Sequence, residues 1–464
     1  MKRILTQSNT VDLLTDNPRK SILLFAAPML VGNLFQEMYN AVDTLVVGKF
    51  DGSSALAAVG AAGVPFMLIN AVTIGFSVGA AILIGQYYGA KGKDDLRRIS
   101  GTVMIMTLIL GIAVTILNYF VCRPLLELLN VKGGLLESAH IYLQTVGWFI
   151  FPMMLYNNAA ALLRGIGNAK MPLVFLVICT VINTVLDLLF VIVFRWPSVY
   201  AVALATGIAQ TVSAVLIIGY IYFFVPELAA KKQEMRIDGQ ILRKTVRLGL
   251  PNAVQTSAVM LGVVVLQRII NDFGDDVIAA YSVGSKINNF AQMPLMSLSS
   301  TISTFVAQNL GAGKDLRIKQ GFRFTMKIAL SLTVILTVFI VIFRHKLIGI
   351  FTTEMDLEVI RIGGEYLMIY STFFFLLAAM NIMQGVMNGA GDTMFTMIAS
   401  LTMTFLRVPL AYLFTGALRM DYKGAWITFP ITWAVSLLIY VLRYRSGRWK
   451  KAVVSSEEYM ESDV

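Results

Sequence analysis

The chain has 464 residues, of which 57% are hydrophobic and only 14% are charged. This apolar fraction is too large for polar surface to cover, so the composition predicts an integral membrane protein and excludes an ordinary soluble domain. The formal net charge of +11 does not indicate nucleic-acid binding, because the basic residues lie at the ends of apolar segments, and the two cysteines, Cys122 and Cys179, are too few for a disulfide framework or a cysteine metal site.

Apolar segments long enough to cross a bilayer recur along the whole chain. A helical span needs about 20 apolar residues, and the sequence contains twelve such segments. They lie near residues 20–48, 55–88, 98–121, 138–163, 171–194, 199–224, 246–270, 277–309, 322–343, 362–387, 394–416 and 424–442. The predicted fold is therefore an all-α integral membrane protein with twelve transmembrane helices.

Three pairs of short motifs relate the two halves of the chain. The clearest pair is "GQYYGAKGKDDLRR" from Gly85 and "AQNLGAGKDLRIKQ" from Ala307; the others are "RKSILLFAAP" with "RKTVRLGLP" and "RGIGNAKMP" with "NGAGDTMF". The offset covers an even number of helices, so both halves enter the membrane in the same sense. We predict two repeated six-helix bundles around a central cleft. The predicted boundaries are 1–224 for the first bundle, 225–241 for a cytoplasmic linker, 242–445 for the second bundle and 446–464 for a cytoplasmic tail.

The first predicted span, "NLFQEMYNAVDTLVV", carries a polar stripe. Gln36, Tyr39, Asn40 and Asp43 follow helical spacing and therefore share one face. A charged carboxylate at the bilayer centre costs about 2.5 to 3.5 kcal/mol or more, so an acid at this position indicates a functional site with a partner.

The fifth predicted span supplies that partner. In "CTVINTVLDLLFV", Thr180, Asn183 and Asp187 lie on one face, and Asp187 is expected at about the same depth as Asp43. Thr206 in the sixth span falls in the same layer. The four groups Asp43, Asn183, Asp187 and Thr206 could hold a sodium ion, or the two acids could share a proton. The alternative is that they only hydrogen-bond the helices together.

The order, spacing and duplication of these motifs resemble the multidrug and toxic compound extrusion (MATE) transporters. The resemblance rests on "PMLVGNLFQEMYNAVDTLVVG" from Pro28, "GQYYGAKGK" and "LRGIGNAKMP", and it covers nearly the whole chain. It implies export of organic, mostly cationic compounds by alternating access, driven by a sodium or proton gradient. It also implies a cation-coupling role for Asp43, Asn183, Asp187 and Thr206.

Further polar positions are predicted to contact substrate. Gln36, Tyr39 and Asn157 match polar positions that accompany the coupling site in the family. Another branch of the family carries coupling acids in spans seven and ten, but those spans contain no acid here, so no second cation site is expected. The second half instead offers Lys286 on span eight and the polar face of span ten, with Asn381 and Gln384. Lys286 could equally be a packing residue near water, and in a cleft it would argue against purely cationic cargo.

Three functions are compatible with a membrane protein of this kind. Cation-coupled export is favoured, with small organic substrates and membrane lipids as partners, no cofactor, no nucleic acid and a monomeric state. A flippase for a lipid-linked precursor would need a more strongly basic cleft. An enzyme or receptor is disfavoured, because no soluble domain, metal cluster or nucleophile with a positioned base is present in the sequence.

Basic residues predict the orientation in the plasma membrane. Lys and Arg are concentrated at the amino terminus, in the even-numbered loops and in the tail, which the positive-inside rule places in the cytoplasm. The amino-terminal and linker residues that carry this bias include Lys2, Arg3, Lys231, Lys232 and Arg236. Both termini are therefore predicted to be cytoplasmic.

We expect a tag inserted in residues 225–241 or attached to the carboxyl terminus to be accessible only from the cytoplasm, because these segments carry the basic bias. A tag beside Arg195, which lies in a loop with few basic residues, should be accessible only from outside. Labelling of intact cells with a membrane-impermeant reagent measures both. An external linker would contradict the topology.

Overall fold

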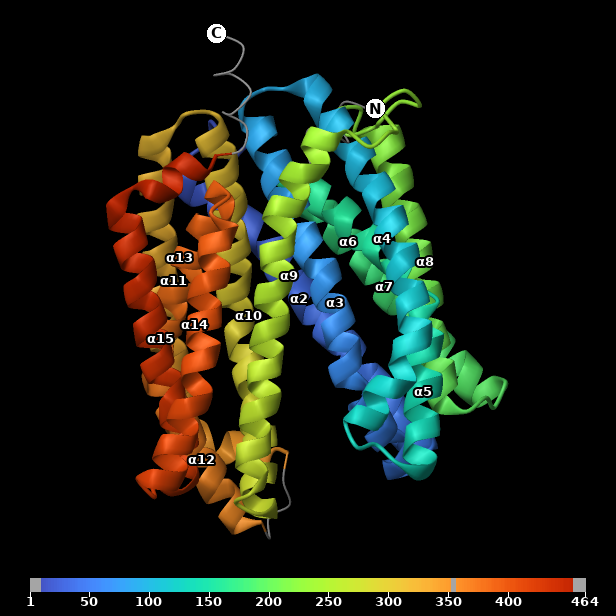
Figure 1. Ribbon diagram of the computed structural model, residues 1–464, viewed down its shortest axis with the longest axis vertical. Coiled ribbons are helices and arrows are strands. Elements are labelled where there is room, and N and C mark those ends of the chain that lie inside the picture. Colours follow the sequence, from blue (N-terminus) through green and yellow to red (C-terminus); the bar gives the residue numbers. More distant parts are fainter. Residues whose placement is uncertain (1–9, 352–355, 454–464) are drawn as a thin grey trace. The chain divides into compact units, whose positions relative to one another are not determined.

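Helices make up nearly all the secondary structure of this protein, and no strand occurs within residues 10–351 and 356–453, which the computed structural model describes. The chain divides into two compact units, shown in Figure 1. The first unit holds the described residues up to Val254 together with Gly311–Gly313, and the second holds Gln255–Leu310 and Lys314–Val453. Lys2, Arg3 and residues 454–464 of the predicted tail lie outside the described residues.

The helices of the first unit follow the predicted spans closely. They are α2 (Pro18–Phe50), α3 (Gly52–Gly89), α4 (Lys93–Leu128), α5 (Gly133–Gly147), α6 (Ile150–Gly165), α7 (Lys170–Leu188), the π-helical turn η1 (Leu189–Val193) and α8 (Ser198–Phe224). After the linker comes α9 (Gly239–Asn271), which begins in the first unit and continues into the second.

The second unit continues with the same sequence of elements. They are α10 (Asp275–Gly311), α11 (Asp315–Gly349), α12 (Leu357–Thr372), α13 (Phe374–Ala390), α14 (Thr393–Tyr412), the π-helical turn η2 (Leu413–Ala417), α15 (Asp421–Ser446) and the short 3₁₀ helix η3 (Arg448–Ala452).

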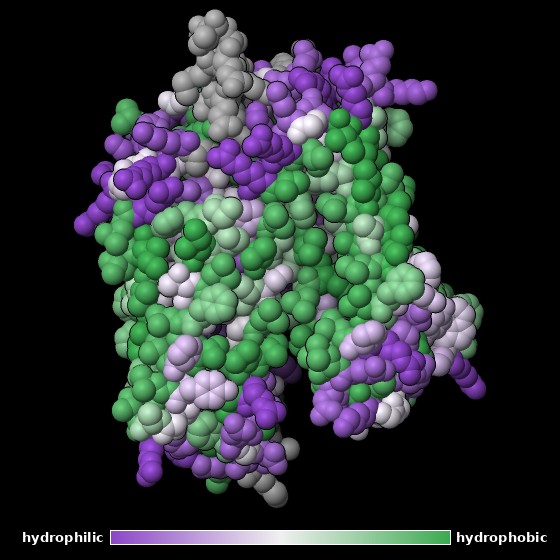
Figure 2. Space-filling model, viewed as in Figure 1, coloured by the Kyte–Doolittle hydropathy of each residue, from purple (hydrophilic) through white to green (hydrophobic). Residues whose placement is uncertain are grey.

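These elements supply the twelve predicted spans. Among the described residues, nine helical segments are long and apolar enough to cross a membrane, and the bent pairs α5–α6 and α12–α13 each form one further span. The bends are 52° and 49°. The remaining predicted span, 277–309, corresponds to α10, which is not among these apolar segments and carries Lys286 and many Ser, Thr, Asn and Gln residues. In each unit the visible face carries hydrophobic side chains over the middle of the helices and hydrophilic ones near their ends (Figure 2).

The duplication predicted from short motifs extends to irregular features of the backbone. The bent pair that starts at Gly133 and Ile150 recurs at Leu357 and Phe374, at one constant spacing along the chain. The π-helical turns at Leu189–Val193 and Leu413–Ala417 recur at the same spacing. Because π turns are rare in proteins, their recurrence at matched positions supports two copies of one six-helix unit.

Packing in the first unit brings three helices together around the polar layer. Helix α2 contacts α7 and α8, and α7 contacts α8 along much of its length. A separate apolar core of α3, α4, α6 and α8, which includes Leu83, Ile99, Leu163 and Ile217, lies beside them. The polar residues of α2, α7 and α8 are therefore held by a packed scaffold.

Glycines allow α9 to approach α3 closely within the first unit. A Cβ atom on Gly79 would lie only 2.7 Å from the backbone nitrogen of Gly249, and one on Gly249 would lie 2.9 Å from the Phe76 side chain. Small residues at such crossings let helix backbones touch. The glycine-rich stretch of α3 that begins at Gly75 is thus a packing surface.

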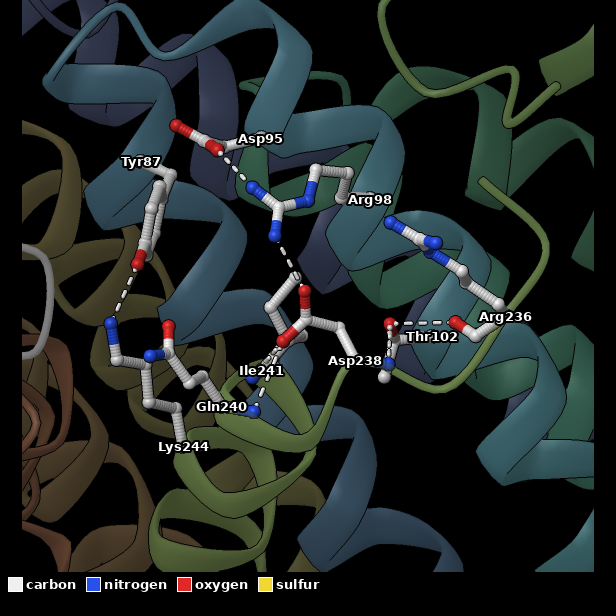
Figure 3. Close-up of polar contacts among 9 residues, drawn as sticks. All are labelled: Tyr87, Asp95, Arg98, Thr102, Arg236, Asp238, Gln240, Ile241 and Lys244. Carbon is white, nitrogen blue, oxygen red and sulfur yellow. Dashed lines mark hydrogen bonds and ion pairs between the residues drawn. The ribbon is translucent and has the colours of Figure 1, made fainter. Parts of the chain in front are cut away.

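The linker before α9 is fastened to α4, as Figure 3 shows. Arg98 donates to Asp238 at 2.5 Å, and the Thr102 hydroxyl donates to the Arg236 carbonyl and accepts from the Asp238 backbone N–H. Asp238 also accepts from the N–H groups of Gln240 and Ile241 in the first turn of α9. Asp238 therefore both caps α9 and ties it to α4.

The surroundings of Asp238 act on its pKa in opposite directions. Partial burial alone would raise the pKa, but the Ile241 N–H and the Arg98 guanidinium stabilise the carboxylate and bring the pKa below its ordinary value. Since the folded-state pKa is lowered, the stabilisation is complete above the unfolded-state pKa and is lost as the pH falls through the folded-state pKa.

We expect Asp238→Ala, which removes both the cap and the ion pair, to destabilise the protein by about 1 to 2 kcal/mol at neutral pH. Asp238→Asn keeps a capping oxygen and should cost less. The difference between wild type and Asp238→Asn should disappear in acid. Thermal unfolding in detergent, followed by tryptophan fluorescence, measures these effects.

The matched control is Asp275→Asn, because Asp275 is an exposed acid in the first turn of α10. It should change the unfolding temperature less than Asp238→Ala. Equal stabilities for wild type and Asp238→Ala at neutral pH would show that the contacts of Asp238 contribute nothing.

Candidate functional site

A layer of four buried polar side chains lies between α2, α7 and α8. Asp43 comes from α2, Asn183 and Asp187 from α7, and Thr206 from α8. Asn183 and Asp187 are fully buried, while Thr206 and Asp43 expose only 6% and 9% of their surface. The structure therefore brings together the four residues that the sequence predicts as one site. We call this set the polar layer.

Hydrogen bonds within the polar layer are few and long. Asn183 Nδ2 donates to Thr206 Oγ1 at 3.5 Å, and Thr206 Oγ1 donates to Asp43 Oδ2 at 3.4 Å. Both distances are at the upper limit for a hydrogen bond. The carboxyl groups of Asp43 and Asp187 also act on each other electrostatically. The hydrogen bonds that the protein itself supplies to the polar layer are therefore few and weak.

Four oxygens of the polar layer have no hydrogen-bond donor among the described residues. They are Asp43 Oδ1, Asn183 Oδ1 and both carboxyl oxygens of Asp187. Buried polar atoms nearly always have a partner, and a missing one points to a bound ion, a water or a proton. Carboxylate and amide oxygens without nitrogen or sulfur ligands suit a hard cation. The donor set therefore fits sodium, and the adjacent carboxyl groups also fit a shared proton.

Two tyrosines border the polar layer. Tyr39, one helical turn before Asp43 on α2, interacts with Asp43 and Thr206. Tyr142 on α5 interacts electrostatically with both Asp43 and Asp187. Sequence reasoning did not identify Tyr142, because only the packing of α5 against α8 brings it close. In the sequence, the one feature that could have singled out Tyr142 is its polar hydroxyl group inside an apolar span.

The predicted substrate-contacting residues of the first unit have different environments. Gln36 is exposed, whereas Tyr39 and Asn157 are half-buried. Asn157 Nδ2 donates to the Met153 carbonyl of its own helix at 2.9 Å. None of these three residues is fully buried, as a binding role requires.

The neighbouring asparagine has a clear structural role instead. Asn158 is buried, accepts a hydrogen bond from Ser77 on α3 and donates one to Thr107 on α4, at 3.0 and 2.7 Å. It therefore joins three helices of the first unit. Asn157 and Asn158 are consecutive residues of α6, but they lie on different faces of the helix. Asn157 is on the more accessible face, and Asn158 is on the face that contacts other helices.

In the second unit the predicted contact residues lie on two helices. Lys286 on α10 is exposed, and Asn381 and Gln384 on α13 are half-buried. Ser299 on α10 donates to the Asn381 carbonyl at 2.7 Å, which fixes α13 against α10. Within the described residues, the side chains of Lys286, Asn381 and Gln384 make no hydrogen bonds to one another.

Known proteins share this sequence and fold. The MatE family model matches the chain twice, over residues 28–189 and 250–413. The "Probable multidrug resistance protein YoeA" of Bacillus subtilis (strain 168) is 29% identical over 443 residues, covering 94% of this chain and 95% of that protein. The "Probable multidrug resistance protein NorM" of Thermotoga maritima is 26% identical over 451 residues, covering 95% of each.

Solved structures confirm the predicted fold class. A MATE protein crystallised in complex with MaL6 has a TM-score of 0.88 at 24% identity, covering 95% of this chain and 99% of that one. An outward-facing MATE transporter of the MOP superfamily also has a TM-score of 0.88, at 23% identity, covering 96% and 98%. With the double match of the family model, the chain belongs to the multidrug and toxic compound extrusion (MATE) family of membrane transporters.

Proposed function

We propose that this transporter exports amphipathic, mostly cationic organic compounds in exchange for sodium or protons. The observation that carries the coupling part of the proposal is the set of four buried oxygens without a donor in the polar layer. Two adjacent carboxyl groups inside a membrane bundle are costly unless a cation or a proton neutralises them. The proposal of a drug as cargo draws on the relatives, two of which are named as multidrug resistance proteins.

An ion gradient can drive transport through the polar layer only if binding of the ion in that layer changes the conformation of the protein. Each positive charge that moves inward across a 100 mV inside-negative potential releases about 2.3 kcal/mol. Sodium or a proton bound among Asp43, Asn183, Asp187 and Thr206 would draw their oxygens together and shift α2 against α7 and α8. That rearrangement weakens cargo binding and favours the outward-open state, because the two ligands stabilise different states.

Cargo binding is assigned to the predicted contact residues, none of which is fully buried. They are Gln36, Tyr39 and Asn157 in the first unit and Lys286, Asn381 and Gln384 in the second. Neutral polar groups in apolar surroundings orient a ligand without fixing its identity, which suits a broad substrate range. The protein works as a monomer in the cell membrane, with both termini in the cytoplasm and without a cofactor or a nucleic-acid partner.

We expect Asp43→Asn and Asp187→Asn each to abolish gradient-driven export while the protein still folds and inserts. Asparagine keeps the size of the side chain but removes the negative charge that binds the cation. The double variant should be no worse than either single one, because the two acids serve one ion. Cargo flux in reconstituted vesicles, under separately imposed sodium, proton and voltage gradients, measures the effect and identifies the ion.

The matched control is Glu37→Gln, which neutralises a half-buried acid of α2 outside the polar layer and should leave export intact. Wild-type transport against a gradient by either aspartate variant would mean that the layer only holds helices together.

We also expect alanine at Gln36, Tyr39 or Asn157 to change the apparent affinity for individual cargoes by about two- to tenfold, the range of one neutral hydrogen bond. Expression and thermal stability should change little, since these side chains are not buried. Competition between unlabelled cargoes and a fluorescent cargo checks this. Unchanged affinities for every cargo in all three variants would remove these residues from the binding surface.

A further inference from the structure

An arginine is buried inside the second unit. Arg407 lies on α14 and exposes only 5% of its surface. Its guanidinium carbon is 4.5 Å from the centre of the Phe429 ring, and its Nε and Nη2 atoms both donate to Thr432 Oγ1, at 3.4 and 3.2 Å. Arginine stays protonated in proteins, so this side chain is a fixed positive charge.

No acidic side chain among the described residues pairs with Arg407. The acids of the second unit that form ion pairs have other partners: Asp392 pairs with Arg443, and Glu365 with Arg361 and Lys423. The contact with Phe429 offsets only part of the cost of removing a guanidinium from water. A buried cation inside a membrane-spanning unit therefore points to an anion as its partner.

The polar groups around Arg407 are mainly hydrogen-bond donors. Tyr281, Tyr366 and Tyr370 are its electrostatic neighbours. The Tyr366 hydroxyl accepts from Asn288 at 3.0 Å, and the Tyr370 hydroxyl accepts from Gln292 at 3.1 Å. Neither hydroxyl donates to another described residue. Each hydroxyl therefore keeps a hydrogen that it can donate, as do the guanidinium N–H groups that do not bond to Thr432.

The position of Arg407 corresponds to the polar layer of the other repeat. Asn183 precedes the π-helical turn that begins at Leu189 by six residues, and Arg407 precedes the turn that begins at Leu413 by six residues. At the matching position in the repeat, the first unit has two acids beside an amide, whereas the second has a cation beside tyrosines. The duplication thus produced two layers of opposite charge.

We propose that Arg407, Tyr366 and Tyr370 form an anion-binding site that takes the carboxylate of an amphipathic molecule. The planar guanidinium can hold a carboxylate through paired N–H donors, and the rings of Tyr366 and Tyr370 are held in place by Trp426, Phe429 and Trp433. This goes beyond cation-coupled export of cationic compounds, because it gives the second unit a separate site for molecules that carry a negative group.

The test compares two dyes that differ in one group. A rhodamine with a free carboxylate and the methyl ester of the same rhodamine are titrated against the full-length protein in detergent, and binding is followed by fluorescence anisotropy. In wild type the carboxylate dye should bind about tenfold more tightly than the ester. Arg407→Gln should bring this ratio close to one, and Arg407→Lys should lower it partly, because lysine keeps the charge but loses the planar fork.

Three further variants separate this site from other effects. Tyr366→Phe and Tyr370→Phe remove only a hydroxyl and should lower the ratio several-fold without weakening the ester. Arg443→Gln removes a paired arginine of the same unit and should leave the ratio unchanged. Asp43→Asn should also leave it unchanged, so failure of the proposed coupling does not affect this result.

Equal binding of the two dyes by wild type would overturn the proposal, and this comparison needs no variant. A tenfold ratio that persists in folded Arg407→Gln would overturn it as well. If that variant does not fold, the tyrosine variants decide: an unchanged ratio in both contradicts the site, and a lowered ratio supports it.

Discussion

The cost of placing a charge where water cannot reach it governs the organisation of both units. Neither lipid nor packed apolar side chains solvate an ion, so a charged group in a membrane-spanning helix persists only with a partner. Asp43 and Asp187 in the first unit and Arg407 in the second are all buried. None of the three has an oppositely charged side chain as a partner among the described residues. We therefore propose that in each unit a bound ion or ligand supplies the missing partner.

Much of the fold could be predicted from the sequence because membrane helices can be recognised by the length and hydropathy of their apolar segments. The boundaries of the predicted spans lie close to those of the helices, and the predicted duplication reappears in the paired bends and π turns. The bends were predictable only in part: Pro152 lies four residues after Trp148 and removes a helical hydrogen bond at the first break, whereas no proline accompanies the matching break near Phe373.

The candidate site was predictable in part. Asp43, Asn183, Asp187 and Thr206 lie together because helical spacing and depth follow simple geometry. Tyr142 was not predicted, because its proximity to Asp43 and Asp187 depends on how α5 packs against the other helices. The rule that singles out an acid in a span applies equally to Arg407, but only the structure shows that this arginine is buried and without an acid.

The continuity of α9 has a mechanical consequence. This helix begins in the first unit, where Gly249 packs closely against α3, and its later part belongs to the second unit. The division falls between Val254 and Gln255, just after Pro251. Proline removes one backbone hydrogen bond from a helix and weakens its resistance to bending there. The sequence therefore makes α9 easiest to bend beside Pro251, close to the point where the helix passes from the first unit into the second.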